Sequence, residues 1–484
     1  MRIHALLKRN YLLLVYPGVL IAFVVTTFFE SSSDLLSELP SSQFSTLKSK
    51  ILFNVFFVGV FFILNLILLK TLRYKVKILQ SLSAKKTKVF IVAIWTLFAF
   101  IPSVISGQNL RSMLSNFFYL FGVGHLYPNF VDLRGTLAAI SDVKEVGQSF
   151  SIKCDVIDEP CLGWRWTYGS MILNLHRVPG LIQENAPFFA ILFFLVFIKI
   201  LYNLIQTNLD ALIFLLLLVS GTSLLTIERM NIDILTLPLF YAISKLNQRN
   251  LIFRLTTVLA WLFFSLTKYY TFPLILVIVL ILKSKREKLF AILLTAYFIP
   301  TVLRDLGQAR LEEQVFGYAA TTGISIISGF LEGSKMPNFQ IFTTSGTLTV
   351  VSFILLCLIF RRLYRNKLGV TNADSSTKYL FLLVILNLVT CWIISESYPY
   401  RLISTLALVP VFTSTLRERQ ELLFLNIFLL YAVFAGIHIS LTFTRNLFFA
   451  ILIASLIGMI AELVGNVVNF KVPYLPNRGK RTNT

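Results

Sequence analysis

Charged residues are scarce in this sequence, and their scarcity excludes an ordinary soluble domain. They make up 14% of the 484 residues, whereas soluble globular proteins carry about 25%. Acidic residues are scarcer than basic ones, with 23 Asp and Glu against 44 Lys and Arg. Hydrophobic residues reach 56%, and Phe alone occurs 45 times. This composition predicts a polytopic membrane protein.

Motifs that bind metals or nucleotides are also missing. The sequence has no Walker A loop, no dinucleotide-binding glycine pattern and no HExxH motif. The histidines are too scattered for a metal site, at His4, His125, His176 and His438. Neither a cofactor nor a metal is therefore predicted.

Cysteine is rare and occurs in two settings. Cys357 and Cys391 lie in apolar runs, where they are expected to fill core space. Cys154 and Cys161 lie close together in a polar segment. They form either a disulfide or two free thiols. Both alternatives stay open because sequence spacing alone does not fix the geometry of a bridge.

Long apolar runs dominate what is present. Those able to cross a bilayer, alone or with help from neighbours, cover residues 11–29, 51–69, 89–106, 187–205, 211–226, 233–244, 252–267, 271–282, 289–303, 343–360, 378–395, 401–415, 421–440 and 446–469. A span needs about 20 apolar residues, so the short runs at 233–244 and 271–282 must extend into their polar flanks or be broken helices. The predicted fold class is all-α: a polytopic transmembrane helix bundle of about 14 spans (12 to 14), with a long extracytoplasmic loop bearing short interfacial helices.

Lys and Arg gather in short loops between these runs, and cytoplasmic loops hold the excess of basic residues. With 14 spans, both basic termini and the basic loops near residues 70–88, 245–254, 283–288, 361–367 and 417–419 fall on one side. The formal charge of +21 then reflects topology and anionic lipid rather than nucleic acid. The predicted location is the cell (plasma) membrane, with a multi-pass chain and both termini cytoplasmic.

The longest polar interruption, residues 107–187, is predicted to lie outside the cytoplasm because its charges are nearly balanced. The turns at 228–233, 267–271 and 396–401 fall on the same side. The predicted divisions are a two-span N-terminal extension (1–88), a membrane core including the long loop (89–415), and two C-terminal spans with a basic tail (416–484).

One of these turns contains Glu228, Arg229, Asn231 and Asp233 between two apolar runs. Ionisable residues at membrane depth are costly, so they are functional candidates by default. A simple turn in which Glu228 and Arg229 pair locally is the alternative interpretation.

Basic residues also occur where the distribution of positive charge disfavours them. Arg229, Lys268 and Arg401 all lie on the outer side, and together they could hold a lipid phosphate. Lys268 with the adjacent Tyr269 also fits a snorkelling anchor in an aromatic belt.

The long loop adds a carboxylate and a group of aromatic residues. Asp132 and Arg134 form either a local ion pair or a site in which Asp132 is a general base for an incoming hydroxyl. Trp164, Trp166 and Tyr168 follow several acidic residues, an arrangement that suits a sugar. The same aromatic residues would also serve as interface anchors.

Four short motifs together resemble the integral-membrane glycosyltransferases of the C superfamily, and more closely their polyprenol-phosphate-mannose-dependent alpha-mannosyltransferases. The motifs are Phe130-Val131-Asp132-Leu133-Arg134, Glu228-Arg229-x-Asn231-Ile232-Asp233, Lys268-Tyr269-Tyr270-Thr271-Phe272-Pro273 and Tyr400-Arg401-Leu402-Ile403. The chain differs from the family in having two additional spans before the acidic loop, and in having Met230 where a small residue is more typical.

The resemblance implies a many-helix membrane fold, an extracytoplasmic active site and a donor sugar on polyprenyl phosphate. It implies that Asp132 is the catalytic base and that Arg229, Lys268 and Arg401 bind the donor phosphate. The remaining substrate-binding candidates are Arg134, Glu228, Asn231, Asp233, Trp164, Trp166, Tyr168 and Tyr269.

The predicted function is therefore transfer of mannose or a similar hexose from a polyprenyl-phosphate donor to an acceptor on the extracytoplasmic face. Its expected partners are the donor, a lipid or glycan acceptor and membrane lipids, without nucleic acid. A transporter or flippase of a lipid-linked or amphiphilic solute is one alternative. A polymerase or ligase of envelope polysaccharide is another.

Overall fold

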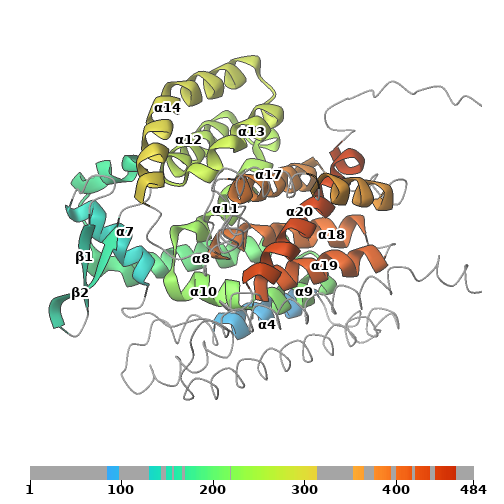
Figure 1. Ribbon diagram of the computed structural model, residues 1–484, viewed down its shortest axis with the longest axis horizontal. Coiled ribbons are helices and arrows are strands. Elements are labelled where there is room, and N and C mark those ends of the chain that lie inside the picture. Colours follow the sequence, from blue (N-terminus) through green and yellow to red (C-terminus); the bar gives the residue numbers. More distant parts are fainter. Residues whose placement is uncertain are drawn as a thin grey trace, which may run out of the picture.

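The computed structural model describes residues 84–96, 130–142, 149–154, 157–165, 169–218, 220–312, 351, 353–364, 375–393, 399–416, 420–435 and 442–464, and the statements below concern these residues. They are predominantly helical, with a two-stranded sheet at one end of the helical body (Figure 1). The helical character of the predicted fold is therefore confirmed. The first two apolar runs, Trp166, Tyr168 and the basic C-terminal tail lie outside the described residues.

Each apolar run from residue 187 onward contains helix, because these stretches are rich in Leu and have few glycines or prolines in their interiors. The α-helices there are α8 (Ala186–Leu204), α9 (Asn208–Leu218), α10 (Gly221–Arg229), α11 (Thr236–Ser244), α12 (Leu251–Thr267), α13 (Ile275–Ile281), α14 (Lys285–Glu312), a helix over 353–364, α17 (Ser375–Ile393), α18 (Leu408–Thr415), α19 (Gln420–Ala435) and α20 (Thr442–Val464).

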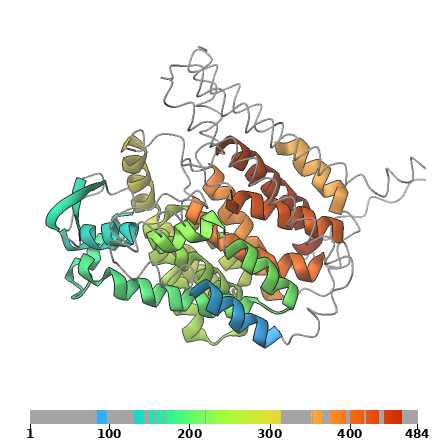
Figure 2. The ribbon, with the colours of Figure 1, turned by 90° about the horizontal axis from the view of Figure 1, so that it is seen from below.

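The helices share one hydrophobic core that extends along the chain from Ile91 to Met459. Near the start of the described chain, α4 (Ala84–Trp95) lies against α8 and α9 (Figure 2). Lys85, Lys86 and Lys88 therefore belong to the first turns of a helix and not to a loop. The core includes residues of α19 and α20, so the last described helices belong to the same body as the rest.

One described helix, Gln183–Leu204, is long and apolar enough to cross a membrane, with 22 residues. The pair Asn208–Leu218 and Gly221–Arg229 meets the same criterion jointly, with a bend of 66° between its halves. The other apolar helices in this part of the chain are shorter. Length and composition thus give a weak indication of membrane association, and the bundle of about 14 spans stays a prediction.

Three helices begin as 3-10 segments at the predicted outer turns. They are η5 (Ile232–Leu235) before α11, η7 (Tyr269–Leu274) before α13 and η11 (Pro399–Ala407) before α18. Asn231 caps η5 by accepting the backbone N–H of Asp233 at 3.0 Å. With these segments, the two short apolar runs form the helices Ile232–Ser244 and Tyr269–Ile281, which are still shorter than a membrane span. Because a 3-10 helix has three residues per turn, successive polar side chains in these segments project about 120° apart, and residues three apart lie on the same face.

The long loop contributes α7 (Val131–Asp142) and an antiparallel hairpin of β1 (Ser149–Cys154) and β2 (Ile157–Arg165). The hairpin is a feature of the loop that was not predicted, within a chain that is otherwise helical in its described residues. Its first strand alternates apolar and polar residues, a period-two pattern that favours a strand. The register pairs Cys154 with Ile157 and Phe150 with Trp164. A disulfide between Cys154 and Cys161 and two free thiols remain the two alternatives.

The helix of this loop that the structure describes, α7, is buried. The stretch 110–121, where an interfacial helix is predicted, lies outside the described residues. Residues 131–140 of α7 are buried all round. The helix contacts β1, η3 (Ser170–Arg177), η4 (Gln183–Asn185) and α8. Its sequence mixes apolar residues with Asp132, Arg134 and Thr136, and these polar side chains are buried by the surrounding elements.

The loop returns to the helical body at Gly169 and Ser170. The N–H of Gly169 donates to the carbonyl oxygen of Thr267 at 3.1 Å. Both the N–H and the hydroxyl of Ser170 donate to Oδ2 of the buried Asp305, each at 2.8 Å. These bonds fix the far end of the loop to the last residue of α12 and to the second half of α14.

Two further groups of buried polar side chains join helices within the body. Asp210 accepts the N–H groups of Gln206 and Thr207 at the start of α9 and a hydroxyl bond from Thr413 of α18. Elsewhere the Tyr364 hydroxyl is 2.6 Å from both Asn426 Nδ2 of α19 and the Ser455 hydroxyl of α20. Satisfied polar groups of this kind fix which helices are neighbours.

We expect Gly169→Ala to loosen the attachment of the loop. A Cβ at this position would lie 1.7 Å from the carbonyl oxygen of Leu266, so the backbone must shift at a cost of about 1–3 kcal/mol or more. Hydrogen exchange should accelerate across residues 169–177. Gly180→Ala is the control, because its Cβ would meet only Asn185 at 3.7 Å and the change carries chiefly the strain of a positive φ. Unchanged exchange in Gly169→Ala would contradict this account of the attachment.

Candidate functional site

The predicted site residues from distant parts of the chain meet at one place in the helical body. The start of α7 contacts the end of α10, and η11 contacts α10, α11 and η5. In Figure 1 the contact between these segments lies where α7, which belongs to the long loop, meets the central helices α10 and α11. The site is therefore assembled from the outer turns that the predicted topology puts on one side.

Asp132 is buried in the first turn of α7 and is held by two residues of the α10–η5 turn. Nδ2 of Asn231 donates to its Oδ2 at 2.7 Å. Nη1 of Arg229 lies 3.6 Å from its Oδ1. Nε of Arg229 also donates to Oε2 of Glu228 at 3.0 Å. Arg229 thus lies between two carboxylates, and its side chain keeps 22% of its surface exposed.

The backbone beside these residues adopts an unusual conformation at two positions. Phe130 has φ 59° and Met230 has φ 46°, the left-handed region that costs an L-residue about 1–2 kcal/mol. The N–H of Phe130 donates to the carbonyl oxygen of Glu228 at 3.2 Å, so the two turns are bonded to each other. Glycine would adopt the conformation of Met230 without this cost. Strain of this kind is concentrated at functional sites.

Asp233 is the centre of the second half of the cluster. Its side chain is fully buried, and Nζ of Lys268 lies 3.4 Å from its Oδ1. The hydroxyl of Tyr270 donates to the same oxygen. Nε of Arg401 lies 3.9 Å from its Oδ2, and the Arg401 guanidinium lies over the Tyr270 ring at 5.1 Å from the centroid. Asp233 therefore joins η5, η7 and η11.

The amide of Asn231 links the two halves. Its Nδ2 donates to Asp132, while its Oδ1 accepts from Nζ of Lys268 at 3.2 Å and from the N–H of Asp233. The polar path thus runs from Asp132 through Asn231 and Lys268 to Asp233 and Arg401. Three carboxylates (Asp132, Glu228, Asp233) face three cations (Arg229, Lys268, Arg401) along it.

Burial shifts the pKa of two charged side chains in this cluster, Asp132 and Lys268. It raises the pKa of Asp132 above that of an ordinary carboxyl group, although Arg229 and the bond from Asn231 oppose the shift. In the turn after α12, burial lowers the pKa of Lys268 to about 8, against the opposing effect of Asp233. A carboxylate with a raised pKa is a better proton acceptor near neutral pH.

Not all of the predicted site residues join the cluster. Tyr269 faces Asp305 instead: burial raises the pKa of its hydroxyl, and the charge of Asp305 adds to the effect. Arg134 is buried two residues beyond Asp132, which directs it to a different face of α7. Trp164 lies in β2, where it pairs with Phe150 of β1.

Sequence analysis missed two features of the site. Tyr270 contacts both Asp233 and Arg401, although Tyr269 was the predicted substrate-binding tyrosine. Asp305 is a buried acid that holds Ser170 and pairs with Arg304, with Nη2 and Oδ1 3.1 Å apart. An Arg-Asp pair at the end of an apolar run was the signal, and it meets the same criterion as the Glu228 turn.

Among the described residues, no group of three or more His, Cys, Asp or Glu side chains is placed to hold a metal ion. No known family model, curated protein or solved structure matches the chain.

We expect Lys268→Met to destabilise the protein by about 3–5 kcal/mol, because it leaves Asp233 buried without its closest cation. Thermal unfolding in detergent measures the loss. Lys268→Met combined with Asp233→Asn should lose much less than the sum of the single changes, since the uncompensated charge is then removed. Lys283→Met, at an exposed lysine, is the control. Additive losses in the double variant would contradict the pairing.

Proposed function

We propose that the chain is a polytopic membrane protein whose candidate site lies at the extracytoplasmic ends of its helices. Large apolar side chains exposed on several helices support this setting, because they are stable against lipid and unfavourable in water. They include Phe188, Leu195, Ile252, Leu259, Leu276, Leu293, Leu303, Ile354 and Leu358. The basic loops and the site then lie on opposite sides of the bilayer, with both termini cytoplasmic, in the plasma membrane.

We propose further that the protein is a glycosyltransferase that uses a polyprenyl-phosphate sugar, mannose or a similar hexose. The observation that carries this proposal is the convergence of Asp132 with three cations in one polar network. Such a transfer needs a base for the acceptor hydroxyl and positive charge for the departing phosphate. Asp132 can supply the base and the three cations can supply the positive charge, and all four side chains belong to the same network.

In the proposed reaction, Asp132 removes the proton of the acceptor hydroxyl as its oxygen attacks the anomeric carbon. The bond between that carbon and the phosphate oxygen breaks, and the electron pair leaves with polyprenyl phosphate. Asn231 and Arg229 orient the Asp132 carboxylate, which retains further acceptor positions for the hydroxyl. Asp132 is buried, so the proposed reaction requires that the acceptor hydroxyl enter a site that is closed to solvent in this structure.

The three cations divide into two roles in this proposal. The side chains of Arg229 and Arg401 keep 22% and 15% of their surface exposed, and both are proposed to contact the donor phosphate. Lys268 keeps only 1% and is engaged with Asp233 and Asn231. Lys268 therefore acts on the phosphate at a distance, by holding the network that positions the two guanidinium groups.

A transporter or flippase of a lipid-linked solute is the second candidate. The bend of 66° between α9 and α10, the helix that ends in the Glu228 turn, favours it. Broken helices that end in polar residues form binding sites in many transporters.

The deciding experiment uses purified protein in lipid vesicles, radiolabelled polyprenyl-phosphate mannose and a membrane-lipid extract as acceptor. Asp132→Asn should reduce transfer at least about 100-fold, because a general base contributes about 10²–10⁴-fold. Glu184→Gln is the matched control: it makes the same chemical change at an exposed position of η4, which contacts α7. Wild-type transfer by Asp132→Asn would refute the role of Asp132. Movement of the labelled lipid across the vesicles, without transfer of any polyprenyl-phosphate sugar, would favour the transporter.

The rate of transfer should depend on pH through two groups. Activity rises with pH as Asp132 loses its proton, and this rise lies above the range of an ordinary carboxyl because burial raises the pKa of Asp132. Activity falls again near the Lys268 pKa of about 8, where the network loses a positive charge. Lys268→Arg keeps its charge to high pH, so its alkaline decline should move upward. An unchanged decline in Lys268→Arg would exclude Lys268 as its cause.

A further inference from the structure

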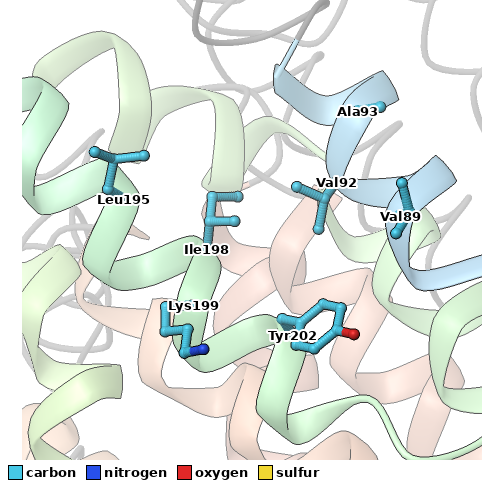
Figure 3. Close-up of a pocket in the computed structure, with 7 residues that line it drawn as sticks. All are labelled: Val89, Val92, Ala93, Leu195, Ile198, Lys199 and Tyr202. Carbon is cyan, nitrogen blue, oxygen red and sulfur yellow. The ribbon is translucent and has the colours of Figure 1, made fainter. Parts of the chain in front are cut away.

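A groove lies between α4 and α8, away from the candidate site. It has a volume of about 440 Å³ and is lined by Val89, Val92, Ala93, Leu195, Ile198, Lys199 and Tyr202. The three α4 residues and the four α8 residues each follow helical spacing, so each set forms one face of its helix. Figure 3 shows the two faces opposite each other. The volume falls within the range of about 300–1,000 Å³ typical of ligand sites.

The groove is apolar at one end and cationic at the other. Leu195 and Ala93 lie toward the apolar end in Figure 3, and Lys199 and Tyr202 lie toward the other. The ammonium group of Lys88 is 5.1 Å from the centre of the Tyr202 ring, which puts a second lysine at the same end. The occupant that fits therefore has a hydrocarbon segment and one anionic group.

The cationic end lies far from the candidate site. Tyr202 comes sixteen residues after Ala186, the first residue of α8, and is therefore about 24 Å from it along the helix axis. The start of α8 follows η4, which contacts α7, the helix that carries Asp132. The groove and the Asp132 cluster are thus at opposite ends of α8. The groove is therefore a separate site: a donor whose phosphate contacts Arg229 and Arg401 cannot also place that phosphate beside Lys199.

We propose that this groove binds one anionic phospholipid, with an acyl chain along the apolar residues and the phosphate between Lys88 and Lys199. The charge of the occupant follows from the two lysines, and its hydrocarbon segment follows from Val92, Ala93 and Leu195. Lysines beside a membrane surface select anionic over neutral lipids. The tyrosine ring at the same level suits the headgroup region. The proposal depends on the proposed membrane setting and is independent of sugar transfer.

Native mass spectrometry of the full chain in detergent tests the proposal, with phosphatidylglycerol and phosphatidylcholine as the probes. One phosphatidylglycerol should bind in preference to phosphatidylcholine. Lys88→Gln and Lys199→Gln should each weaken its binding about fivefold, because each lysine near a membrane surface has an effect of this size. Together they should weaken binding about 25-fold. Lys283→Gln, at an exposed lysine outside the groove, should leave binding unchanged.

Ala93→Trp gives a second, independent test because the indole fills the apolar part of the groove and leaves both lysines in place. It should reduce binding of phosphatidylglycerol while thermal unfolding stays close to that of the wild type. The proposal is overturned if the two lipids bind equally, if Lys283→Gln weakens binding as much as the groove variants do, or if the protein appears as a lipid-free dimer that Ala93→Trp dissociates. Because sugar transfer is not measured, these outcomes are separate from the fate of the proposed enzyme activity.

Discussion

The buried ion pair between Asp233 and Lys268 is the interaction on which the rest of the site depends. Both side chains are almost completely removed from solvent, where an unpaired charge would be very costly. The pair is satisfied by Tyr270 and Asn231 and extended by Arg401. Because these residues belong to three separate turns, the cost of leaving any charge uncompensated holds η5, η7 and η11 together.

The same network determines where Asp132 lies. Asn231 has one amide group and uses both ends of it, one toward Lys268 and the other toward Asp132. The position of α7 is thus coupled to the ion pair through one side chain. The left-handed turns at Phe130 and Met230 are the conformational cost of bringing the two chain segments into register. Burial then gives Asp132 a raised pKa, a property that a proton acceptor needs.

Much of the site could be predicted from the sequence because topology limits where polar residues can go. The positions of basic loops put the turns containing Asp233, Lys268 and Arg401 on one side, and their contact follows from the need to pair buried charges. Which tyrosine joins them could not be predicted. Tyr269 and Tyr270 are adjacent, and in a 3-10 helix they project about 120° apart, so the type of helix decides which one faces Asp233. Sequence periodicity does not distinguish the two helix types over so short a segment.

The long loop was predicted less well than the helical body. Its hairpin was missed because two short strands give a weak signal beside long apolar runs, although Ser149–Cys154 alternates as a strand should. The burial of α7 was missed because it depends on what covers the helix, namely η3, η4 and β1, and such long-range contacts are not encoded in the helix's own pattern. The local sequence determines whether a helix forms, whereas its burial depends on contacts with elements that are distant in the chain.

The central claim is that the network presents two guanidinium groups to one phosphate beside Asp132, and binding of a short-chain polyprenyl phosphate tests it most directly. Arg229→Met and Arg401→Met should each weaken binding about tenfold or more, because a charge-assisted bond to the phosphate is lost. Arg254→Met is the matched control, since Arg254 has the same exposure as Arg229 and is also paired with a glutamate, but lies at the other end of the helices. Equal affinity in all three variants and the wild type would contradict the account.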